Sequence, residues 1–251
     1  MSTELPSVGL TIEQMTQRLY DVHQVENLMA KHVYFHAAAK HHEELDAIWV
    51  KKTPEPHFAQ NQGYYVGMKS LRNYYGDINL VMQRGQLEAL NRRHPDLEVT
   101  EENMGAGLFQ IHPLTTQIIE VADDGETAKG IWYSPGAVGG ADSEGEVKML
   151  WMWERYAVDF AKEDGEWKIW HLHTYTDFGT PVGTSWADST TDSMVGTGVG
   201  GEDGGGSMGG FELPKPDRED VEYHAYSYRQ VPQMLPRMPE PYRTFSETFS
   251  Y

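Results

Sequence analysis

The chain has 251 residues, a formal net charge of −18 and no cysteine. The lack of thiols excludes disulfides, zinc–thiolate sites, iron–sulfur clusters and cysteine nucleophiles. The acidic balance argues against nucleic-acid and anionic membrane partners, because both require clustered Lys and Arg. The N-terminus lacks a basic stretch followed by an apolar one, and no apolar run reaches the roughly 18 residues of a membrane span. We therefore expect a cytoplasmic protein that binds neither nucleic acid nor a membrane.

The first part of the chain has the spacing of helices. Thr11 and Gln14 form the pattern of a capping box, and the apolar period that follows predicts an amphipathic helix over about 12–38. The stretch "HHEELDAIWV" predicts a second helix. A loop broken by Pro and Gly, a short strand near 64–66 and a third helix should follow. Residues 78–106 are polar and predict an insertion that carries a helix.

From residue 107 onward the pattern becomes that of strands. Two β-like runs are joined by "ADDGE" and two more by "KEDGE", and the Asp-Gly pair in each is a hairpin signal. Helices followed by two successive hairpins predict an α+β fold with a mostly antiparallel sheet.

The C-terminal part has a different composition. Residues 196–210 contain nine glycines in fifteen positions. Such a segment buries too little side-chain surface to offset the entropy cost of ordering its backbone. We therefore expect a folded domain over 1–185, a flexible Gly-rich linker over 186–213, and a Pro- and Tyr-rich tail over 214–251. The tail is either disordered or an extended arm that docks its aromatic rings on a folded surface of its own or a neighbouring subunit.

Several stretches carry a family resemblance, namely "ELDAIW", "GYYVGMKSLRNYY" and "ERYAVDFAKEDGEWKIWHLH". Together they resemble the nuclear transport factor two-like superfamily, and within it the SnoaL-like enzymes. The matching positions are Trp49, Gly67, Tyr156, Asp159, Phe160, Asp164, Gly165, Trp167, Ile169 and His171. The match covers about residues 12–178 and is most specific in the terminal hairpin.

The resemblance implies a cone, in which a strongly curved sheet wraps round the long N-terminal helix and encloses an apolar chamber. The family includes dehydratases, isomerases, cyclases and lyases that use no cofactor, and also non-catalytic binding modules. One branch with elongated chains is a cofactor-independent lyase of lignin-derived diarylpropanes. Scytalone dehydratase-like members place an aspartate near the end of the first helix, where this chain offers only Tyr34 and His36.

The stretch "WKIWHLHTYTDF", at 167–178, is dense in aromatic and imidazole groups. With the two-residue period of a strand, one of its faces carries Trp167, Ile169, His171, His173 and Tyr175. In the implied cone, we expect His171 and His173 to face the chamber.

Histidines are the candidate catalytic residues. His112 lies in an otherwise apolar row, where a lone histidine is commonly a hydrogen-bonded core residue, but in the cone His36, His112, His171 and His173 converge on one cavity. Imidazoles with an ordinary pKa near 6.5 suit general acid–base work. We expect His112 and His171 to form the acid–base pair, with His36 assisting. Tyr133 is expected to donate a hydrogen bond to a developing oxyanion.

The chamber wall is expected to stack a small apolar aromatic substrate. The predicted substrate-binding residues are Tyr65, Trp49, Phe109, Trp132 and Tyr175. Each aromatic side chain also has a purely structural interpretation, as core or as a cap on the sheet edge.

A metal site is the alternative interpretation of the histidines. His171 and His173 offer two nitrogens on one strand face, and His32 and His36 offer an i, i+4 pair on a helix. Because the resembling family is generally free of metal, we expect neither a metal nor another cofactor.

The last two strands are apolar on both faces, with Trp151 and Trp153 opposite Leu150 and Met152. Such a sheet needs two covers. One is the chamber with the first helix, and the other is a neighbouring subunit or the docked tail, with Trp170 facing the partner surface. We therefore expect a homo-oligomer, either a dimer or a trimer.

The leading functional hypothesis is a cofactor-independent lyase of aromatic compound catabolism. It would eliminate water from a small hydroxylated aromatic compound such as a lignin-derived dimer, with or without C–C cleavage that releases formaldehyde. An isomerase or cyclase acting on a steroid- or polyketide-like substrate, and a non-catalytic binding module, are the alternatives.

Overall fold

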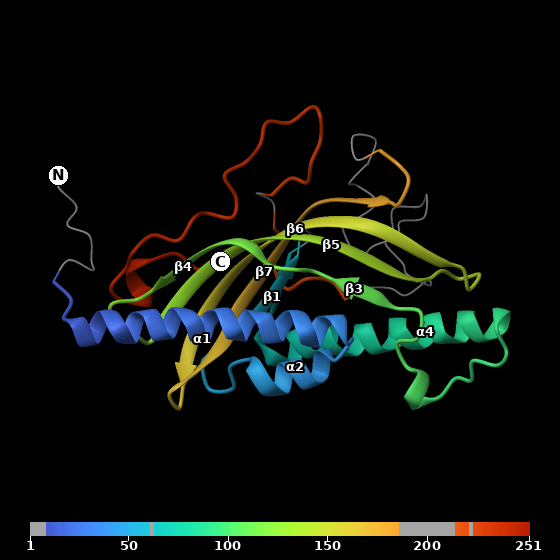
Figure 1. Cartoon of the computed structure of the whole chain (residues 1–251), viewed down its shortest axis with the longest axis horizontal. Helices are drawn as coiled ribbons and strands as arrows, with labels where there is room; N and C mark the ends of the chain where they lie inside the picture. Colours follow the sequence, from blue (N-terminus) through green and yellow to red (C-terminus); the bar gives the residue numbers. More distant parts are fainter. Residues whose placement is uncertain (1–8, 61–62, 186–213, 221–222) are drawn as a thin grey trace.

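The computed structural model describes residues 9–60, 63–185, 214–220 and 223–251. Its main helices are α1 (Ile12–Ala37), α2 (His41–Ile48), α3 (Gly67–Leu71) and α4 (Ile78–Arg93). Its strands are β1 (His57–Gln60), β2 (Gly63–Val66), β3 (Phe109–Ile111), β4 (Thr115–Val121), β5 (Thr127–Ala141), β6 (Val147–Glu163) and β7 (Glu166–Pro181). The predicted α+β class is confirmed, and the long helices precede the long strands (Figure 1).

The N-terminal helix α1 begins at the predicted capping box. The main-chain nitrogen of Thr11 donates to Oε1 of Gln14 at 2.8 Å, and that of Gln14 donates to Oγ1 of Thr11 at 3.2 Å. Helix α2 also lies where it is predicted. Helix α3 continues through one π-helical turn, Arg72–Asp77, into α4, which is the helix predicted within 78–106.

The described part of the chain forms one curved, mostly antiparallel sheet with the strand order β2-β1-β7-β6-β5-β3, and β4 also pairs with β5. The β4–β5 and β6–β7 pairs are the two predicted hairpins. Strand β1 lies where the sequence predicts a loop, and that prediction is wrong. Because β1 pairs in parallel with β7, with His57 opposite His171, the contact is non-local and leaves no hairpin signal in the sequence.

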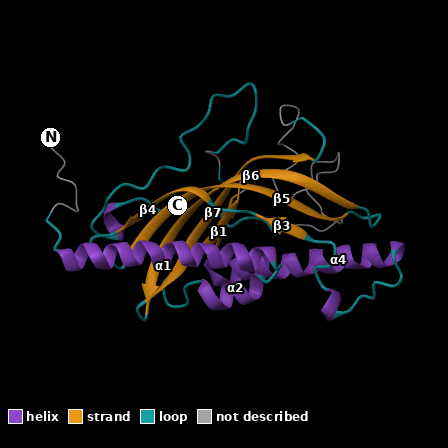
Figure 2. Cartoon of the chain, in the orientation of Figure 1, coloured by secondary structure: helices purple, strands orange, loops and turns teal. Residues whose placement is uncertain are grey.

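The helices cover one side of the sheet (Figure 2). The main hydrophobic core lies between the helices and the sheet. It includes Val25 and Met29 of α1, Trp49 after α2, and Leu172 of β7. The long N-terminal helix therefore lies along a curved sheet, as the resemblance implies. No helix within the described ranges is both long and apolar enough to span a bilayer.

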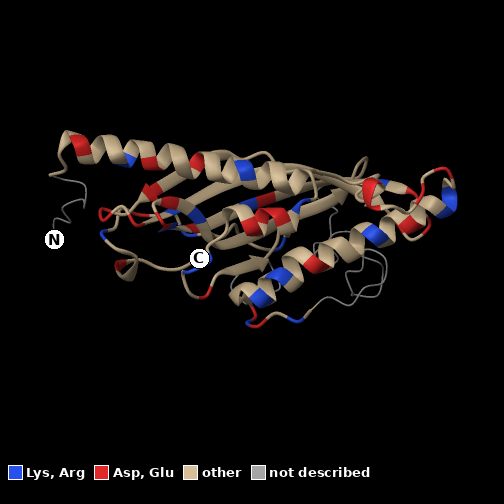
Figure 3. Ribbon diagram, turned by 90° about the horizontal axis from the view of Figure 1, so that it is seen from below, with Lys and Arg blue, Asp and Glu red and all other residues tan. Residues whose placement is uncertain are grey.

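Charged residues are interspersed on the helices rather than segregated. In the view of Figure 3, both blue and red segments occur along α4 and α1. Acidic and basic residues therefore share these helices in this view.

The C-terminal tail packs on the side of the sheet that faces away from the helices (Figure 1). Tyr223 and Tyr251 are buried there against Ala157 of β6 and Tyr175 of β7. The ring of Trp170, predicted to face a partner, lies 4.5 Å from that of Phe245 in the chain's own tail. The tail thus supplies one cover of the sheet. The predicted Gly-rich linker, 186–213, lies outside the described residues, and the homo-oligomer stays a prediction.

A buried polar cluster anchors the tail. Asp159 of β6 accepts hydrogen bonds from Nδ1 of His171 at 2.8 Å and from the main-chain nitrogen of Tyr251 at 2.9 Å, and it also pairs with the buried Lys129. Burial raises the pKa of Asp159, but the hydrogen bond from His171 and the charge of Lys129 outweigh burial, so the pKa lies below its ordinary value. Asp159 is therefore ionised and holds the tail at neutral pH.

His57 completes this cluster from β1. Its ring stacks on that of His171 with the centroids 4.0 Å apart, and its Nε2 donates to the main-chain oxygen of Tyr251 at 2.8 Å. Burial, followed by the like charge of His171, lowers the pKa of His57 to about 3. His57 is therefore neutral in the folded chain at any pH near neutrality.

The pH dependence of stability tests this cluster. Between pH 6.5 and 3, an unfolded chain protonates residue 57 and the folded chain does not, so the unfolded state binds more protons and the free energy of unfolding falls as the pH drops. Urea denaturation between pH 6 and 4 should show that His57→Gln flattens this dependence, by up to about 1.4 kcal/mol per pH unit. The exposed His23 provides the control His23→Gln, and equal slopes for both variants would contradict the assignment.

Candidate active site

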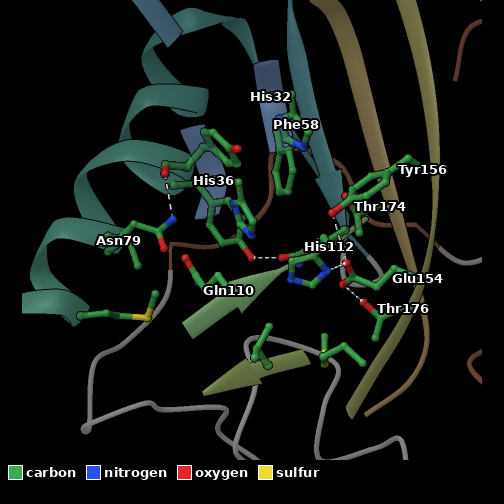
Figure 4. Close-up of a pocket in the computed structure, with 17 residues that line it drawn as sticks. His32, His36, Phe58, Asn79, Gln110, His112, Glu154, Tyr156, Thr174 and Thr176 are labelled. Carbon is green, nitrogen blue, oxygen red and sulfur yellow. Dashed lines mark hydrogen bonds and ion pairs between the residues drawn. The ribbon is translucent and has the colours of Figure 1, made fainter. Parts of the chain in front are cut away.

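A cavity of about 130 Å³ opens between the helices and the inner face of the sheet (Figure 4). Its aromatic wall consists of Phe58, Tyr74, Tyr75 and Tyr156. Its titratable groups other than tyrosine are His32, His36, His112 and Glu154. Further polar side chains on its lining are Gln60, Asn79, Gln110, Thr174 and Thr176. An aromatic pocket with a few convergent polar groups has the character of a small-molecule site.

His112 and Glu154 form an ion pair on the sheet side of the cavity. Nδ1 of His112 lies 3.1 Å from Oε2 of Glu154, and both side chains are almost fully buried. Nδ1 of His112 has no hydrogen-bond partner among the described residues, so the contact with Glu154 is an ion pair without a hydrogen bond. The carboxylate of Glu154 thus places a negative charge directly beside the imidazole.

Two hydroxyl groups complete the surroundings of Glu154. Tyr156 donates to Oε2 at 3.2 Å and Thr176 donates to Oε1 at 3.0 Å. Burial raises the pKa of Glu154, but the charge of His112, together with the two hydroxyl groups, outweighs burial and leaves the pKa below its ordinary value. Glu154 is therefore a fixed negative charge beside the cavity.

Gly136 gives the His112 ring its space. A Cβ atom at position 136 would lie 2.8 Å from Nδ1 of His112 and 2.7 Å from the main-chain oxygen of Ile111. Any side chain there would push the ring or the end of β3 aside. The glycine in β5 thus positions the imidazole next to Glu154.

His36 lies beside His112 but has a different electrostatic environment. Their ring centroids are 5.1 Å apart, and Nδ1 of His36 lies 3.2 Å from Nε2 of His41. Burial, followed by the like charges of His112, His41 and His32, holds the pKa of His36 well below its usual range. The side chain of His36 is half-buried, because it borders the cavity. His36 is therefore a neutral imidazole at pH 7.

A second buried carboxylate, Glu44 of α2, supports the helix side of the cavity. It accepts hydrogen bonds from His32 at 2.8 Å, from Nε1 of Trp49 at 3.0 Å and from the hydroxyl of Tyr75 at 2.7 Å. Burial and the adjacent Glu44 raise the pKa of Tyr75 well above its ordinary value. Tyr75 is therefore a protonated phenol with its hydrogen directed away from the cavity.

The structure places three of the predicted residues on the opposite face of the sheet. His171 contacts Asp159, His173 lies 3.2 Å from Asp220 at ion-pair distance, and Tyr175 packs on Tyr223. All three face the tail, so the expectation that His171 and His173 face the chamber is wrong. The proposed pairing of His112 with His171 across a substrate is wrong for the same reason.

A β-bulge explains this error. In the β6–β7 ladder Asp159 pairs with His171 and the next residue, Phe160, pairs with Ile169, so Trp170 has no partner. One extra residue reverses the facing of every side chain beyond it. The inner face therefore carries Ile169 and then Leu172, followed by Thr174 and Thr176.

The other predicted aromatic residues lie away from the cavity. Trp49 and Trp132 belong to the main core, and the hydroxyl of Tyr65 donates to the main-chain oxygen of Pro214 at 3.0 Å. Tyr133 and Phe109 are 43% and 39% exposed, so neither is enclosed by a chamber. Of the predicted site residues, only His36 and His112 line the cavity.

The prediction missed Glu154, although the sequence contains a signal for it. Met152, Glu154, Tyr156 and Val158 alternate along β6, which keeps its facing throughout the β5–β6 ladder. A carboxylate in an otherwise apolar inward row must be paired, which makes it a candidate for the site as well as for the core. The aromatic wall from Tyr74 and Tyr75 lies on the π-helical turn, for which the sequence offers no comparable signal.

The described residues include no group of three or more His, Asp or Glu side chains with the geometry of a metal site. Pairs such as His112 with Glu154 and His32 with Glu44 are each committed to an ion pair or hydrogen bond between themselves.

Comparison with known proteins agrees with this architecture. A profile of the SnoaL-like domain matches residues 17–173, which is more than half of the chain. The chain belongs to the SnoaL-like family. Searching the curated proteins with the sequence gives no match.

Solved structures of similar fold share little sequence with this SnoaL-like chain. One is a hexachlorocyclohexane dehydrochlorinase, LinA-type3, from Novosphingobium barchaimii, with 16% identity over 68% of this chain and 95% of that chain and a TM-score of 0.46. A protein of unknown function from Mycobacterium tuberculosis has 18% identity, coverage of 65% and 76%, and a TM-score of 0.41. An NTF2-like protein from Novosphingobium aromaticivorans has 15% identity, coverage of 66% and 87%, and a TM-score of 0.39.

Proposed function

We propose that the protein is a cofactor-independent lyase that eliminates water from a small hydroxylated aromatic compound. The observation that carries the proposal is the contact between two imidazoles of different charge environment, His36 and His112, in one aromatic cavity. Neighbouring titratable groups whose environments differ in this way can serve as base and acid in one reaction.

His112 is the proposed acid. The fixed charge of Glu154, 3.1 Å away, stabilises the imidazolium, which protonates the departing hydroxyl of the substrate. His36 is the proposed base. When Nδ1–H of His36 donates to Nε2 of His41, the lone pair on Nε2 of His36 is left to take a proton from the substrate. The C–H electrons form the new double bond, the C–O bond breaks, and water leaves.

The same pair supports the variant that releases formaldehyde. His36 takes the proton of a hydroxymethyl group, the C–C bond to that group breaks as formaldehyde forms, and its electrons form the new double bond. The neighbouring hydroxyl leaves as water after His112 protonates it. The products are an alkene, formaldehyde and water, and their atoms add up to those of the starting diol.

The size of the cavity restricts the substrate. An apolar cavity of about 150 Å³ accepts one benzene ring, and the cavity here measures about 130 Å³. One aromatic ring therefore fills it, between Phe58 and the tyrosines. With a lignin-derived dimer, the second ring would have to extend beyond the cavity.

Turnover by the metal-stripped protein tests the proposed reaction. Hydroxylated aromatic monomers and dimers are incubated with the protein, absorbance reports new conjugation, and mass spectrometry reports the loss of 18 mass units as water. Glu154→Gln should lower kcat about 100-fold, and the Glu154→Gln, His112→Gln double variant should be little worse because the pair acts as one unit. Glu43→Gln, an exposed acid on α2, is the control.

Other outcomes would identify the alternatives. A conjugated product of unchanged mass would replace elimination with isomerisation. Absence of turnover across the panel, with ligands still bound in the cavity, would favour the binding module.

The pH dependence of kcat/KM gives an independent test of the base. Because the pKa of His36 is lowered, activity should persist below pH 6.5 and fall only as His36 becomes protonated at lower pH. His41 contributes to this shift as a like charge, so His41→Gln should move the acidic limb to higher pH. An acidic limb that does not move in this variant, or moves equally in His23→Gln, would eliminate His36 as the base.

A further inference from the structure

One of the polar side chains on the cavity lining, Gln110, has an oxygen without a hydrogen-bond partner in the described part of the chain. This atom, Oε1, is buried. Gln110 lies on the cavity lining, between Asn79 and His112 in the view of Figure 4. Such an acceptor, left without a donor, costs free energy that a bound ligand can recover.

The position of Gln110 in the sheet explains why it points inward. Its neighbours on β3, Phe109 and Ile111, are 39% and 44% exposed, so the alternation of the strand directs the side chain between them to the cavity. Gln110 pairs across the ladder with Val138, which lines the cavity too. An apolar residue at position 110 would fill the same space and would leave no amide oxygen without a hydrogen-bond partner.

The spacing along the chain relates Gln110 to the reaction. His112 follows β3 directly, two residues after Gln110, and both side chains line the cavity. Two residues of extended chain span roughly 7 Å, about the length of a benzene ring with its two para substituents. The reacting carbon and a group on the far side of the same ring can therefore contact the two residues together.

We propose that Gln110 determines specificity, with its Oε1 accepting a hydrogen bond from a phenolic hydroxyl on the ring that occupies the cavity. This inference rests on the proposed function for its substrate class, a 4-hydroxyphenyl compound with the leaving hydroxyl on its side chain. The other amides are already engaged, because Oε1 of Gln60 accepts from Tyr74 at 2.6 Å and Nδ2 of Asn79 donates to the main-chain oxygen of Tyr75 at 2.8 Å.

A pair of ligands isolates this contact from the reaction. Calorimetry compares p-cresol with 4-methylanisole, in which a methyl group replaces the phenolic hydrogen, on the wild type, Gln110→Met and Gln24→Met. Gln24 is a half-buried residue of α1 away from the cavity and serves as the matched control. The wild type and the control should bind p-cresol at least about tenfold more tightly, and Gln110→Met should bind the two ligands about equally.

Turnover provides the second measurement. With 4-hydroxyphenyl and 4-methoxyphenyl substrates, the ratio of kcat/KM should exceed about ten in the wild type and approach one in Gln110→Met. Equal affinity of the wild type for the two ligands, weak binding of p-cresol, or a preference retained by Gln110→Met would overturn the inference. Selective binding of p-cresol without turnover of any substrate would contradict the proposed lyase while leaving the role of Gln110 supported.

Discussion

Two carboxylates buried on opposite faces of one strand organise this protein. Strand β6 directs Glu154 to the cavity and Asp159 to the tail, and neither charge can remain unpaired away from water. A histidine pairs with each carboxylate, His112 on the inner face and His171 on the outer face. The same strand therefore creates a reactive surface on one side and an anchoring surface on the other.

The two surfaces differ in what covers them. On the outer face, the main chain of Tyr251 donates a hydrogen bond to Asp159 and Lys129 forms an ion pair with it, so residues of the chain occupy all the space around this carboxylate. On the inner face, Glu154 and His112 border a cavity and are accompanied by a second, neutral imidazole, His36. A filled cluster suits structural support, and a pair beside an open volume suits chemistry, which is why we locate the reaction on the inner face.

The sequence predicts the helices and strands of this fold well, but it predicts poorly on which face of the sheet the side chains of the last strand lie. The capping box at Thr11, the helical periods and the two Asp-Gly hairpins are local signals, and the structure contains all of them. The bulge at Trp170 places two residues of β7 opposite one of β6, which becomes visible only when the two strands are aligned. The parallel pairing of β1 with β7 joins strands that are far apart in the sequence, so it leaves no local signal either. The alternation around Glu154 was sufficient to predict an inward carboxylate, since no bulge interrupts β6 in its pairing with β5.

The most direct test of this two-sided account compares kcat and thermal stability for His112→Gln and His171→Gln. We predict that His112→Gln lowers kcat by about 100-fold in a protein that still folds, since it removes the acid beside the cavity. His171→Gln should keep kcat close to the wild type and lower the melting temperature, because it removes a hydrogen bond to the buried Asp159. A fully folded His171→Gln variant without activity, or an active His112→Gln variant, would contradict the account.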